Sequence, residues 1–344
     1  MNNNTIRAPY LIFLGAETRP EYAKTGAGLA FWRPELVAGQ FNLPGGTIDL
    51  GVPSLSIRDA KAMGVKSLVI GTASVGGVLP NEWLEHIHEA ISLGMDIVSG
   101  LHQRLNDIEL LQKAAIANNS RLVDVRIPPT SIPVANGKPR SGKRLLTVGT
   151  DCAIGKKYTA LQVERDMKAA GINASFRATG QTGIMIAGEG IPIDSVVSDF
   201  VAGAAELVSP DNSASHWDVI EGQGSLFHPG YSAVSMGLLI GSQPDAFIVC
   251  HEANRNHFVG WESFYLPSIQ QVINRTIDIG AQFNPDIKCV GLSVNTSSLK
   301  GVERIEYMKT LEEEFNIPVC DPLIDGTSNI VSHMIRSSLC EVEN

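Results

Sequence analysis

LLTVGTDCAIGKKYTA, residues 145–160, gives the clearest indication of the fold in this chain. A short apolar run with strand-like composition meets Gly149, and a helix-like segment begins after Gly155 and Lys156. In such a strand–turn–helix junction, consecutive backbone N–H groups and the positive end of the helix dipole form an anion site. The spacing Gly-Thr-Asp-x-x-x-Gly-Lys therefore predicts a phosphate-binding loop.

Lys157 departs from the usual pattern of such a loop. In nucleotide-hydrolysing loops a Ser or Thr at this position ligates the Mg²⁺ that bridges the phosphates. An ammonium group cannot ligate a metal, but it can neutralise phosphate directly, and Thr159 replaces the hydroxyl only if the loop shifts by two residues. The pattern favours a phosphorylated ligand that is held without hydrolysis. Coenzyme A fits, because its phosphates serve only as a handle, and no metal is expected.

The ligand is expected to lie on the loop itself and on the end of a later predicted strand. Asn295, in LSVNTSSL (292–299), is placed to contact the adenine ring, or else to cap the following turn. Cys152 is a conceivable acyl carrier, although a small loop-filling residue is favoured. The expected cofactor-binding residues are Gly149, Thr150, Asp151, Cys152, Ala153, Ile154, Gly155, Lys156, Lys157 and Asn295.

Composition limits the class of protein. The 344 residues suit two domains, and a formal net charge of -9 argues against nucleic acid or an anionic membrane as the main partner. Five dispersed cysteines without metal-ligand spacing indicate reduced thiols. The start of the chain resembles neither a secretion signal nor a membrane anchor, and no apolar run approaches the ~20 residues of a spanning helix. We expect a cytoplasmic homodimer that acts on small molecules.

The chain is expected to fold as two domains. A proline-, glycine- and lysine/arginine-rich stretch at 126–144 has no hydrophobic periodicity, which is typical of a linker. The predicted boundaries are 1–127, a linker at 128–143, and 144–344. On both sides strand-like runs alternate with helical ones, which predicts two doubly wound parallel-sheet α/β domains, the first Rossmann-like and the second similar to P-loop NTPases.

The alternation can be followed by residue number. Before the linker, strands are expected at 10–15, 67–71, 96–100 and 122–125, with helical stretches at 57–64, 81–94 and 106–119. After it, strand-like and helical stretches follow at 144–149, 161–171, 174–178, 217–222, 233–241, 246–250, 268–280, 287–295, 304–315 and 317–321.

Four motifs carry a resemblance to a known family. The loop resembles that of dethiobiotin synthetase, and VIEGQGSL (219–226) is similar to a strand-end segment of the same superfamily. Taken together, the chain resembles the DgcN-type D-glutamate N-acetyltransferases, a family long labelled only as a domain of unknown function. The motifs are VGTDCAIGKKYTALQVE (148–164), ATGQTGIMIAGEGIPIDSVVSDFVAGAAE (178–206), IEGQGSLFHPGYS (220–232) and GLAFWRPE (28–35). The resemblance implies acetyl-CoA and D-glutamate as substrates and N-acetyl-D-glutamate and CoA as products.

Acetyl transfer to an amine requires a base and donors for the developing oxyanion. Glu221 follows a predicted strand, at the sheet edge where α/β sites lie, and His228 follows in a Gly- and Pro-rich loop. These two are the expected catalytic residues. Glu221 is alternatively an acid that holds Mg²⁺ or orients the loop, and His228 a turn residue. His251 and Glu252 form a weaker pair at the next strand end.

A dicarboxylate substrate requires cations, and arginine holds carboxylates bidentately. Arg177 and Arg255 lie near predicted strand ends, and Arg33 contributes only if the N-terminal domain closes over the site. The TGQTG loop lies where the superfamily carries groups that face the substrate. The expected substrate-binding residues are Arg33, Arg177, Thr179, Gln181, Thr182 and Arg255.

Two other classes of function stay open at this point. The superfamily contains ATP-dependent ligases and kinases, for which Glu221, Asp194 and Asp199 would hold the Mg²⁺ of Mg-ATP. A nucleotide-sensing regulator would bind without turnover. Glycine-rich loops at several strand ends speak against a simple sensor.

Overall fold

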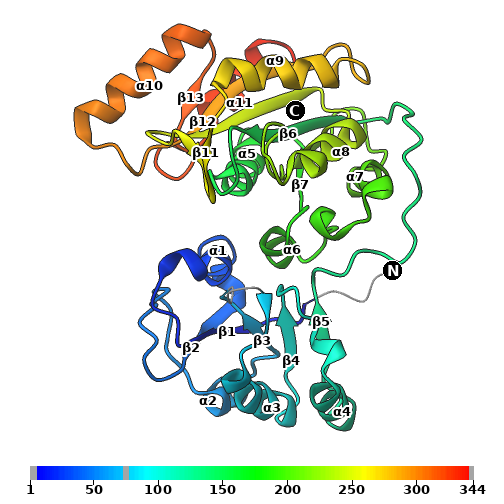
Figure 1. The fold of residues 1–344 in the computed structure, drawn as a ribbon, viewed down its shortest axis with the longest axis vertical. Helices are drawn as coiled ribbons and strands as arrows, with labels where there is room; N and C mark the ends of the chain where they lie inside the picture. The colour runs from blue at the N-terminus through cyan, green and yellow to red at the C-terminus, as the bar shows by residue number, and fades with distance from the viewer. Residues whose placement is uncertain (1–5, 73–76, 341–344) are drawn as a thin grey trace. The chain divides into compact units, whose positions relative to one another are not determined.

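The computed structural model describes residues 6–72 and 77–340, which form two compact units (Figure 1). The N-terminal unit comprises Met1–Pro129 together with Gln181–Pro192, and the C-terminal unit comprises Thr130–Gly180 together with Ile193–Asn344. Each unit is a parallel sheet with helices on its faces, so the predicted α/β fold class is confirmed for both. The domain boundaries expected from the sequence stay a prediction.

The N-terminal unit is built on a five-stranded parallel sheet of order β2-β1-β3-β4-β5. Its strands and helices are β1 (Tyr10–Gly15), α1 (Lys24–Trp32), β2 (Val37–Asn42), α2 (Ile57–Ala62), β3 (Ser67–Ile70), α3 (Leu84–Ser92), β4 (Asp96–Ser99), α4 (Glu109–Ala117) and β5 (Leu122–Asp124). Periodicity explains α3, whose Ile87, Ala90 and Ile91 turn inward at helical spacing. Strand β2 and helix α1 were not expected from the sequence.

The segment 181–192 lies outside the contiguous N-terminal sequence but packs as part of that unit. Helix α6 (Gln181–Ala187) contacts α1, and the hydroxyls of Thr182 and Thr25 lie 2.9 Å apart. Its Ile184, Met185 and Ile186 are buried. Burial of these apolar side chains explains why α6 packs with the N-terminal unit.

The C-terminal unit has a six-stranded parallel sheet of order β13-β12-β9-β6-β8-β7. Its strands are β6 (Lys143–Gly149), β7 (Ala174–Arg177), β8 (Trp217–Ile220), β9 (Ala246–Glu252), β12 (Lys288–Asn295) and β13 (Val319–Cys320), with the hairpin β10 (His257–Phe258) and β11 (Trp261–Tyr265). Its helices are α5 (Lys156–Ala169), α7 (Val201–Val208), α8 (Ser232–Ser242), α9 (Ile269–Gly280), α10 (Gly301–Phe315) and α11 (Ser328–Arg336).

Strand register in the C-terminal unit brings four loops to one edge. Gly149 of β6 is paired with Cys250 of β9, and Arg177 of β7 with Ile220 of β8. Because the strands are parallel, the chain after each of them emerges at the same side of the sheet. The phosphate-loop segment, the start of the TGQTG loop (Thr179 and Gly180), the EGQG segment and His251 are therefore neighbours.

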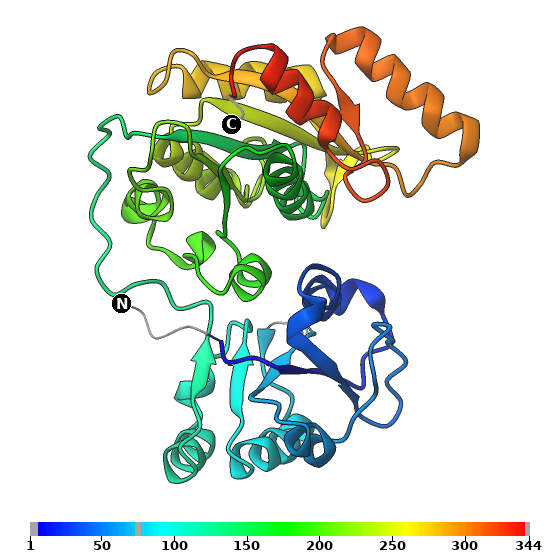
Figure 2. The same cartoon turned by 180° about the vertical axis from the view of Figure 1, so that it is seen from behind.

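The proline-rich stretch between the units is extended but not free (Figure 2). The Glu206 carboxylate of α7 accepts hydrogen bonds from Asn136 N and Gly137 N at 2.9–3.1 Å. The side chain of Gln243 donates to Gly137 O at 3.0 Å. These contacts explain why residues from Thr130 onward belong to the C-terminal unit.

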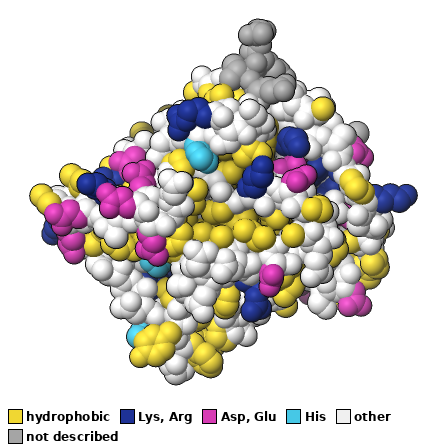
Figure 3. Space-filling view, turned by 90° about the horizontal axis from the view of Figure 1, so that it is seen from above, with side chains coloured by type: hydrophobic (Ala, Val, Ile, Leu, Met, Phe, Trp, Pro, Cys, Tyr) yellow, Lys and Arg dark blue, Asp and Glu magenta, His cyan; other side chains and the backbone are white. Residues whose placement is uncertain are grey.

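On the face drawn in Figure 3, acidic and basic side chains are interspersed and hydrophobic side chains form a band between them. Within residues 6–72 and 77–340, the helices are all too short or too polar to cross a bilayer.

Candidate active site

The loop between β6 and α5 has the backbone that its glycine predicts. Gly155 precedes the first residue of α5 with φ +109°, a conformation that side-chain-bearing residues rarely adopt. Ala153 also has positive φ, at 55°. The loop therefore curls tightly before the helix, as an anion-binding turn requires.

Lys156 is folded back on this loop. Its side chain is buried, and Nζ donates to Asp151 O at 2.6 Å. Burial lowers the pKa of the ammonium. A ligand phosphate offers Lys156 a stronger partner than one neutral carbonyl does.

The side chain of Asp151 fixes the conformation of the loop by hydrogen bonds. Its fully buried carboxylate accepts from Cys152 N at 2.6 Å, from Val259 N at 3.1 Å and from Arg255 Nη1 at 3.0 Å. Val259 lies between β10 and β11, so this one side chain ties the loop to the hairpin. Arg255 also donates to Cys152 O and pairs with Glu252 at 2.6 Å.

His228 lies beside Asp151 inside an aromatic cage. The rings of Tyr231, Trp261 and Phe258 surround it, with centroid distances of 4.5, 4.7 and 5.0 Å. Gly230 N donates to Nδ1 at 3.0 Å, so the neutral ring carries its proton on Nε2. That buried Nε2 lies 3.8 Å from Asp151 Oδ1 and has no hydrogen-bond partner. Burial lowers the pKa of the ring, which keeps it neutral.

Glu221 directly follows β8 and holds the TGQTG loop. Its Oε2 accepts from Thr179 N and Gly180 N, both at 3.0 Å, and Thr179 Oγ1 donates to Glu221 O at 2.6 Å. Burial raises the pKa of the carboxyl, whereas the charge of Lys157 and the two N–H donors lower it. Sequence position alone did not reveal this bracing contact.

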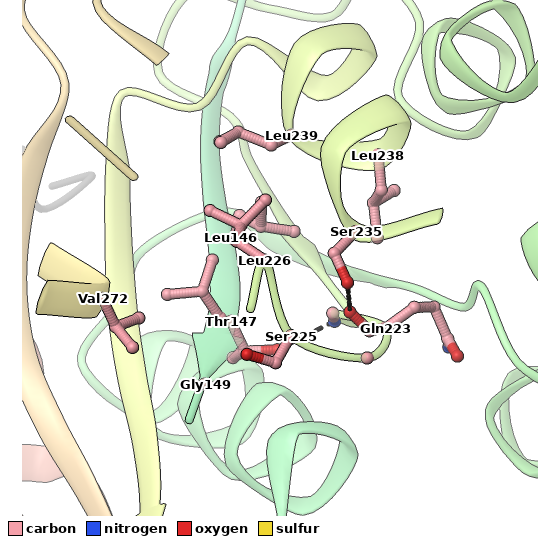
Figure 4. Close-up of a pocket in the computed structure, with 13 residues that line it drawn as sticks. Leu146, Thr147, Gly149, Gln223, Ser225, Leu226, Ser235, Leu238, Leu239 and Val272 are labelled. Carbon is pink, nitrogen blue, oxygen red and sulfur yellow. Dashed lines mark hydrogen bonds between the residues drawn. The ribbon is translucent and has the colours of Figure 1, made fainter. Parts of the chain in front are cut away.

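The glycine after Glu221 permits a close approach of two strands. A Cβ on Gly222 would lie 1.6 Å from Thr147 O, and Gly222 N donates to Thr147 Oγ1 at 2.9 Å. A pocket opens beside this junction, and Figure 4 shows Ser235 Oγ of α8 bonded to Gln223 O at its rim. Its lining is otherwise mainly apolar: Leu146, Val148, Leu226, Leu238, Leu239 and Val272, with Thr147, Gly149, Gly222, Gln223, Gly224, Ser225 and Ser235.

His251, at the end of β9, contacts the loop from the other side. Its Nδ1 lies 3.0 Å from Thr150 Oγ1. Burial, with the nearby charge of Arg255, lowers the pKa of His251 to about 4. Asn295, at the end of β12, directs Nδ2 towards Glu252 at 3.4 Å and accepts from Ser297 N at 3.1 Å, which is the turn-capping arrangement.

The residues predicted to hold a dicarboxylate fall into two sets. Arg33, Gln181 and Thr182 belong to the N-terminal unit, where Arg33 donates to Ile186 O of α6 at 2.6 Å and pairs with Glu35. Arg177, Thr179 and Arg255 belong to the C-terminal unit. The guanidinium of Arg177 pairs with the buried Asp218 at 2.7 Å, in a strand-side network rather than at the loop.

The usual ligands of Mg²⁺ in a nucleotide site do not fit here. Lys157 replaces the hydroxyl, and Thr159 Oγ1 is directed into the core, 2.7 Å from Ser293 Oγ and 3.1 Å from Gly155 O. Asp151, Cys152 and His228 have ligand atoms within 4.8 Å of one another. However, His228 presents a proton at Nε2, and Asp151 is already engaged by three donors. Burial also raises the pKa of the Cys152 thiol.

Several features of the site had little sequence signal. The hairpin HFVGWESFY supplies Phe258 and Trp261 of the cage and Val259 N, but its strands are only two and five residues long. The aromatic residues on both sides of Gly260 were the available indication. The roles of Arg255 and Thr147 depend on strand register, which local pattern does not reveal.

Comparison with known proteins agrees with this architecture. Residues 42–128 match the Rossmann-like N-terminal domain of the DUF1611 family of unknown function, and residues 133–331 match its P-loop domain. A crystal structure of a DUF1611 family protein from Anabaena variabilis is 29% identical, with a TM-score of 0.83, over 96% of this chain and 100% of that one.

Two curated relatives carry a functional name. A protein of a Pseudoalteromonas species is 46% identical over 96% of this chain and 99% of its own length, and one from Tritonibacter scottomollicae is 45% identical over 95% and 98%. Both are named D-glutamate N-acetyltransferase. The match extends across both units, and the chain belongs to the DUF1611 family.

Proposed function

We propose that this protein is a D-glutamate N-acetyltransferase that transfers an acetyl group from acetyl-CoA to the amino group of D-glutamate. The observation that carries the proposal is the 46% identity, over nearly the full length of both chains, to a relative with that name. The P-loop geometry supports it independently. A loop with a lysine in the metal-ligating position suits a phosphate handle better than phosphoryl transfer.

The loop 149–157 is proposed to hold the pyrophosphate of CoA. The dipole of α5, backbone N–H groups of the turn and the two lysines Lys156 and Lys157 provide the positive potential. Asp151 does not meet the ligand in this scheme, because its carboxylate supports the loop from within. The contact of Asn295 with adenine stays a prediction.

Glu221 is proposed as the base that takes the proton of the amine. A base must be ionised at working pH yet have a pKa near it. Burial raises the pKa of Glu221, and Lys157 with the two N–H donors opposes that rise. The pKa of Glu221 is raised overall, chiefly by burial, which makes this carboxylate a stronger proton acceptor than an exposed one.

His228 is proposed as a hydrogen-bond donor rather than a base. Its Nδ1 is engaged by Gly230 N, and Nε2 presents a proton without a partner in the protein. A neutral imidazole in this tautomer stabilises a developing oxyanion and cannot accept a proton at Nε2.

The length of CoA imposes a condition on these roles. About a dozen bonds join its phosphate to its sulfur, which corresponds to roughly 14 Å when extended, by analogy with four residues of extended chain. Glu221 and His228 both lie next to the phosphate loop. The pantetheine arm must therefore be bent for the thioester to reach them.

The proposed contacts with D-glutamate differ between the two sets. Arg177 and Arg255 neutralise Asp218 and Asp151, so their proposed role is to position the strand and the loop. Thr179, next to Glu221 in the C-terminal unit, is the proposed substrate contact there. The roles expected for Arg33, Gln181 and Thr182 stay predictions. A homodimer and a cytoplasmic location remain proposals from composition.

A ligase or kinase is less well supported. That reading uses Glu221, Asp194 and Asp199 as metal ligands, and the two aspartates are exposed on short 3₁₀ turns. The test of the proposed activity is mass spectrometry of D-glutamate incubated with enzyme and acetyl-CoA carrying a deuterated acetyl group. The expected product is N-acetyl-D-glutamate with the full isotope shift. Unchanged D-glutamate would contradict the proposal.

A further inference from the structure

We propose that the ammonium of Lys157 is a built-in replacement for the Mg²⁺ that other phosphate-binding loops hold at this position. The inference deepens the proposed function and rests on it, because it assigns the phosphate handle of CoA to this loop. It makes binding independent of divalent metal. It also makes the single residue Lys157 the switch between a metal-free and a metal-dependent loop.

The hydroxyl ligand of a nucleotide-bound metal is absent from its usual place in this loop. Position 157 offers an ammonium, and the hydroxyl of Thr159 is fully buried against Ser293. Thr159 cannot turn towards the ligand without breaking its bonds to Ser293 Oγ and Gly155 O. An ion at this point would lack its protein hydroxyl ligand.

Glu221 stands where such a metal site has its acidic residue. Glu221 follows β8, the strand beside β6, at the edge where the loop lies. Its carboxylate is buried and, among the residues that the structure describes, receives two backbone N–H bonds, both on Oε2. A buried carboxylate needs a compensating positive charge to stay ionised. Lys157 is the cation whose charge acts on it and lowers its pKa.

Lys156 and Lys157 are adjacent in sequence but have different surroundings. Lys156 is buried and directs Nζ into the loop, onto Asp151 O. Lys157 is half-buried, with its Nζ 4.7 Å from the ring centroid of Tyr158. Lys156 is therefore engaged inside the turn, whereas Lys157 lies on its half-buried outer side, beside Tyr158.

The exchange of a metal for an ammonium also suits the chemistry. Mg²⁺ polarises a phosphoryl group for transfer, which a handle does not need. A fixed single charge neutralises phosphate without activating it. A lysine in this place therefore favours a held ligand over a hydrolysed one.

The test is calorimetric titration of the full-length protein with CoA, once in EDTA and once in excess Mg²⁺. The variants are Lys157→Ala and Lys157→Thr. Lys168→Ala is the matched control, because Lys168 lies on the same helix, half-exposed and paired with Glu164. Free Mn²⁺, followed by electron paramagnetic resonance, reports metal binding directly. Thermal unfolding confirms that each variant is folded.

The expected wild-type affinity for CoA is the same with and without Mg²⁺, as is that of Lys168→Ala. Lys157→Ala should weaken binding about tenfold to hundredfold in both buffers, as the loss of a charge-assisted contact does. Lys157→Thr should be equally weak in EDTA but recover at least tenfold in Mg²⁺, and should take up Mn²⁺ only when CoA is present.

Four outcomes would overturn the inference. Wild-type binding that requires Mg²⁺, or Lys157→Ala binding CoA as tightly as wild type, contradicts it while leaving the acetyltransferase proposal intact. Lys157→Thr that is not rescued by Mg²⁺ contradicts the placement of the ammonium at the metal position. A wild-type protein that does not bind CoA in either buffer contradicts both proposals.

Discussion

At the scale of single residues, the site is organised by buried polar groups whose partners come from distant parts of the chain. Asp151 receives donors from its own loop and from residues 255 and 259. Leaving such a carboxylate unpaired in the interior costs several kcal/mol. The loop and the hairpin are therefore held together by one side chain.

Glu221→Gln tests the proposed base. The amide keeps the size of the side chain but cannot accept a proton, so kcat should fall about a hundredfold. The affinity for CoA should stay within about threefold, and steady-state kinetics with titration of CoA measure the two effects separately. Weakened CoA binding with unchanged kcat would instead place Glu221 at the phosphate end only.

His228→Gln and His228→Ala separate a donor from a base. The glutamine amide can present an N–H where Nε2 lies, so His228→Gln should retain activity within about tenfold of wild type. His228→Ala should lose about 10²–10³-fold in kcat, as the loss of an oxyanion donor does. Equal losses in both variants would contradict the donor role. So would an acid limb in the wild-type pH profile that His228→Gln removes.

His251 makes stability depend on pH. Its pKa is lowered from 6.5 to about 4 in the folded protein, chiefly by burial. Between these values the unfolded chain binds the proton and the folded one does not, so stability is lost as pH falls from 6.5 to about 4. The loss is about 3 kcal/mol. Urea unfolding at pH 7 and pH 4.5 should show a smaller loss in His251→Gln than in wild type, and identical losses would contradict this origin.

At the scale of elements, strand ends and tight turns position the residues of the candidate site. Alternation of apolar strands and periodic helices predicted most elements of both sheets, including β6, α5, β8 and β9. It did not predict α6, because a seven-residue helix has too few turns for a clear period. The hairpin strands were missed for the same reason of length.

Gly222→Ala tests the close packing of β6 and β8. The added methyl would lie 1.6 Å from Thr147 O, and a backbone atom cannot move aside cheaply. We expect a loss of about 3 kcal/mol or more in unfolding free energy. The control is Gly45→Ala, which has positive φ but open space around it, and should cost only about 1–2 kcal/mol. Urea denaturation measures both, and equal losses would show that backbone conformation rather than contact is decisive.

At the scale of the whole molecule, the chain is divided in a way that no local pattern could reveal. Residues 181–192 pack with the N-terminal unit although they lie within the C-terminal sequence. The C-terminal unit resumes at Ile193, whose N–H donates to Thr179 O at 2.9 Å. Tertiary burial decides this, and sequence periodicity does not record which partner a helix face meets. The same limit applies to Arg177 and Arg255, whose carboxylate partners lie 41 and 104 residues away.

The most direct test of the account is the release of CoA thiol from acetyl-CoA by the intact protein, with EDTA present and ATP absent. D-glutamate is the acceptor, and L-glutamate the matched control. The account predicts thiol release with D-glutamate that EDTA does not reduce, and little or none with L-glutamate. Absence of release with D-glutamate, together with turnover that appears only on addition of Mg-ATP, would contradict it and favour a ligase.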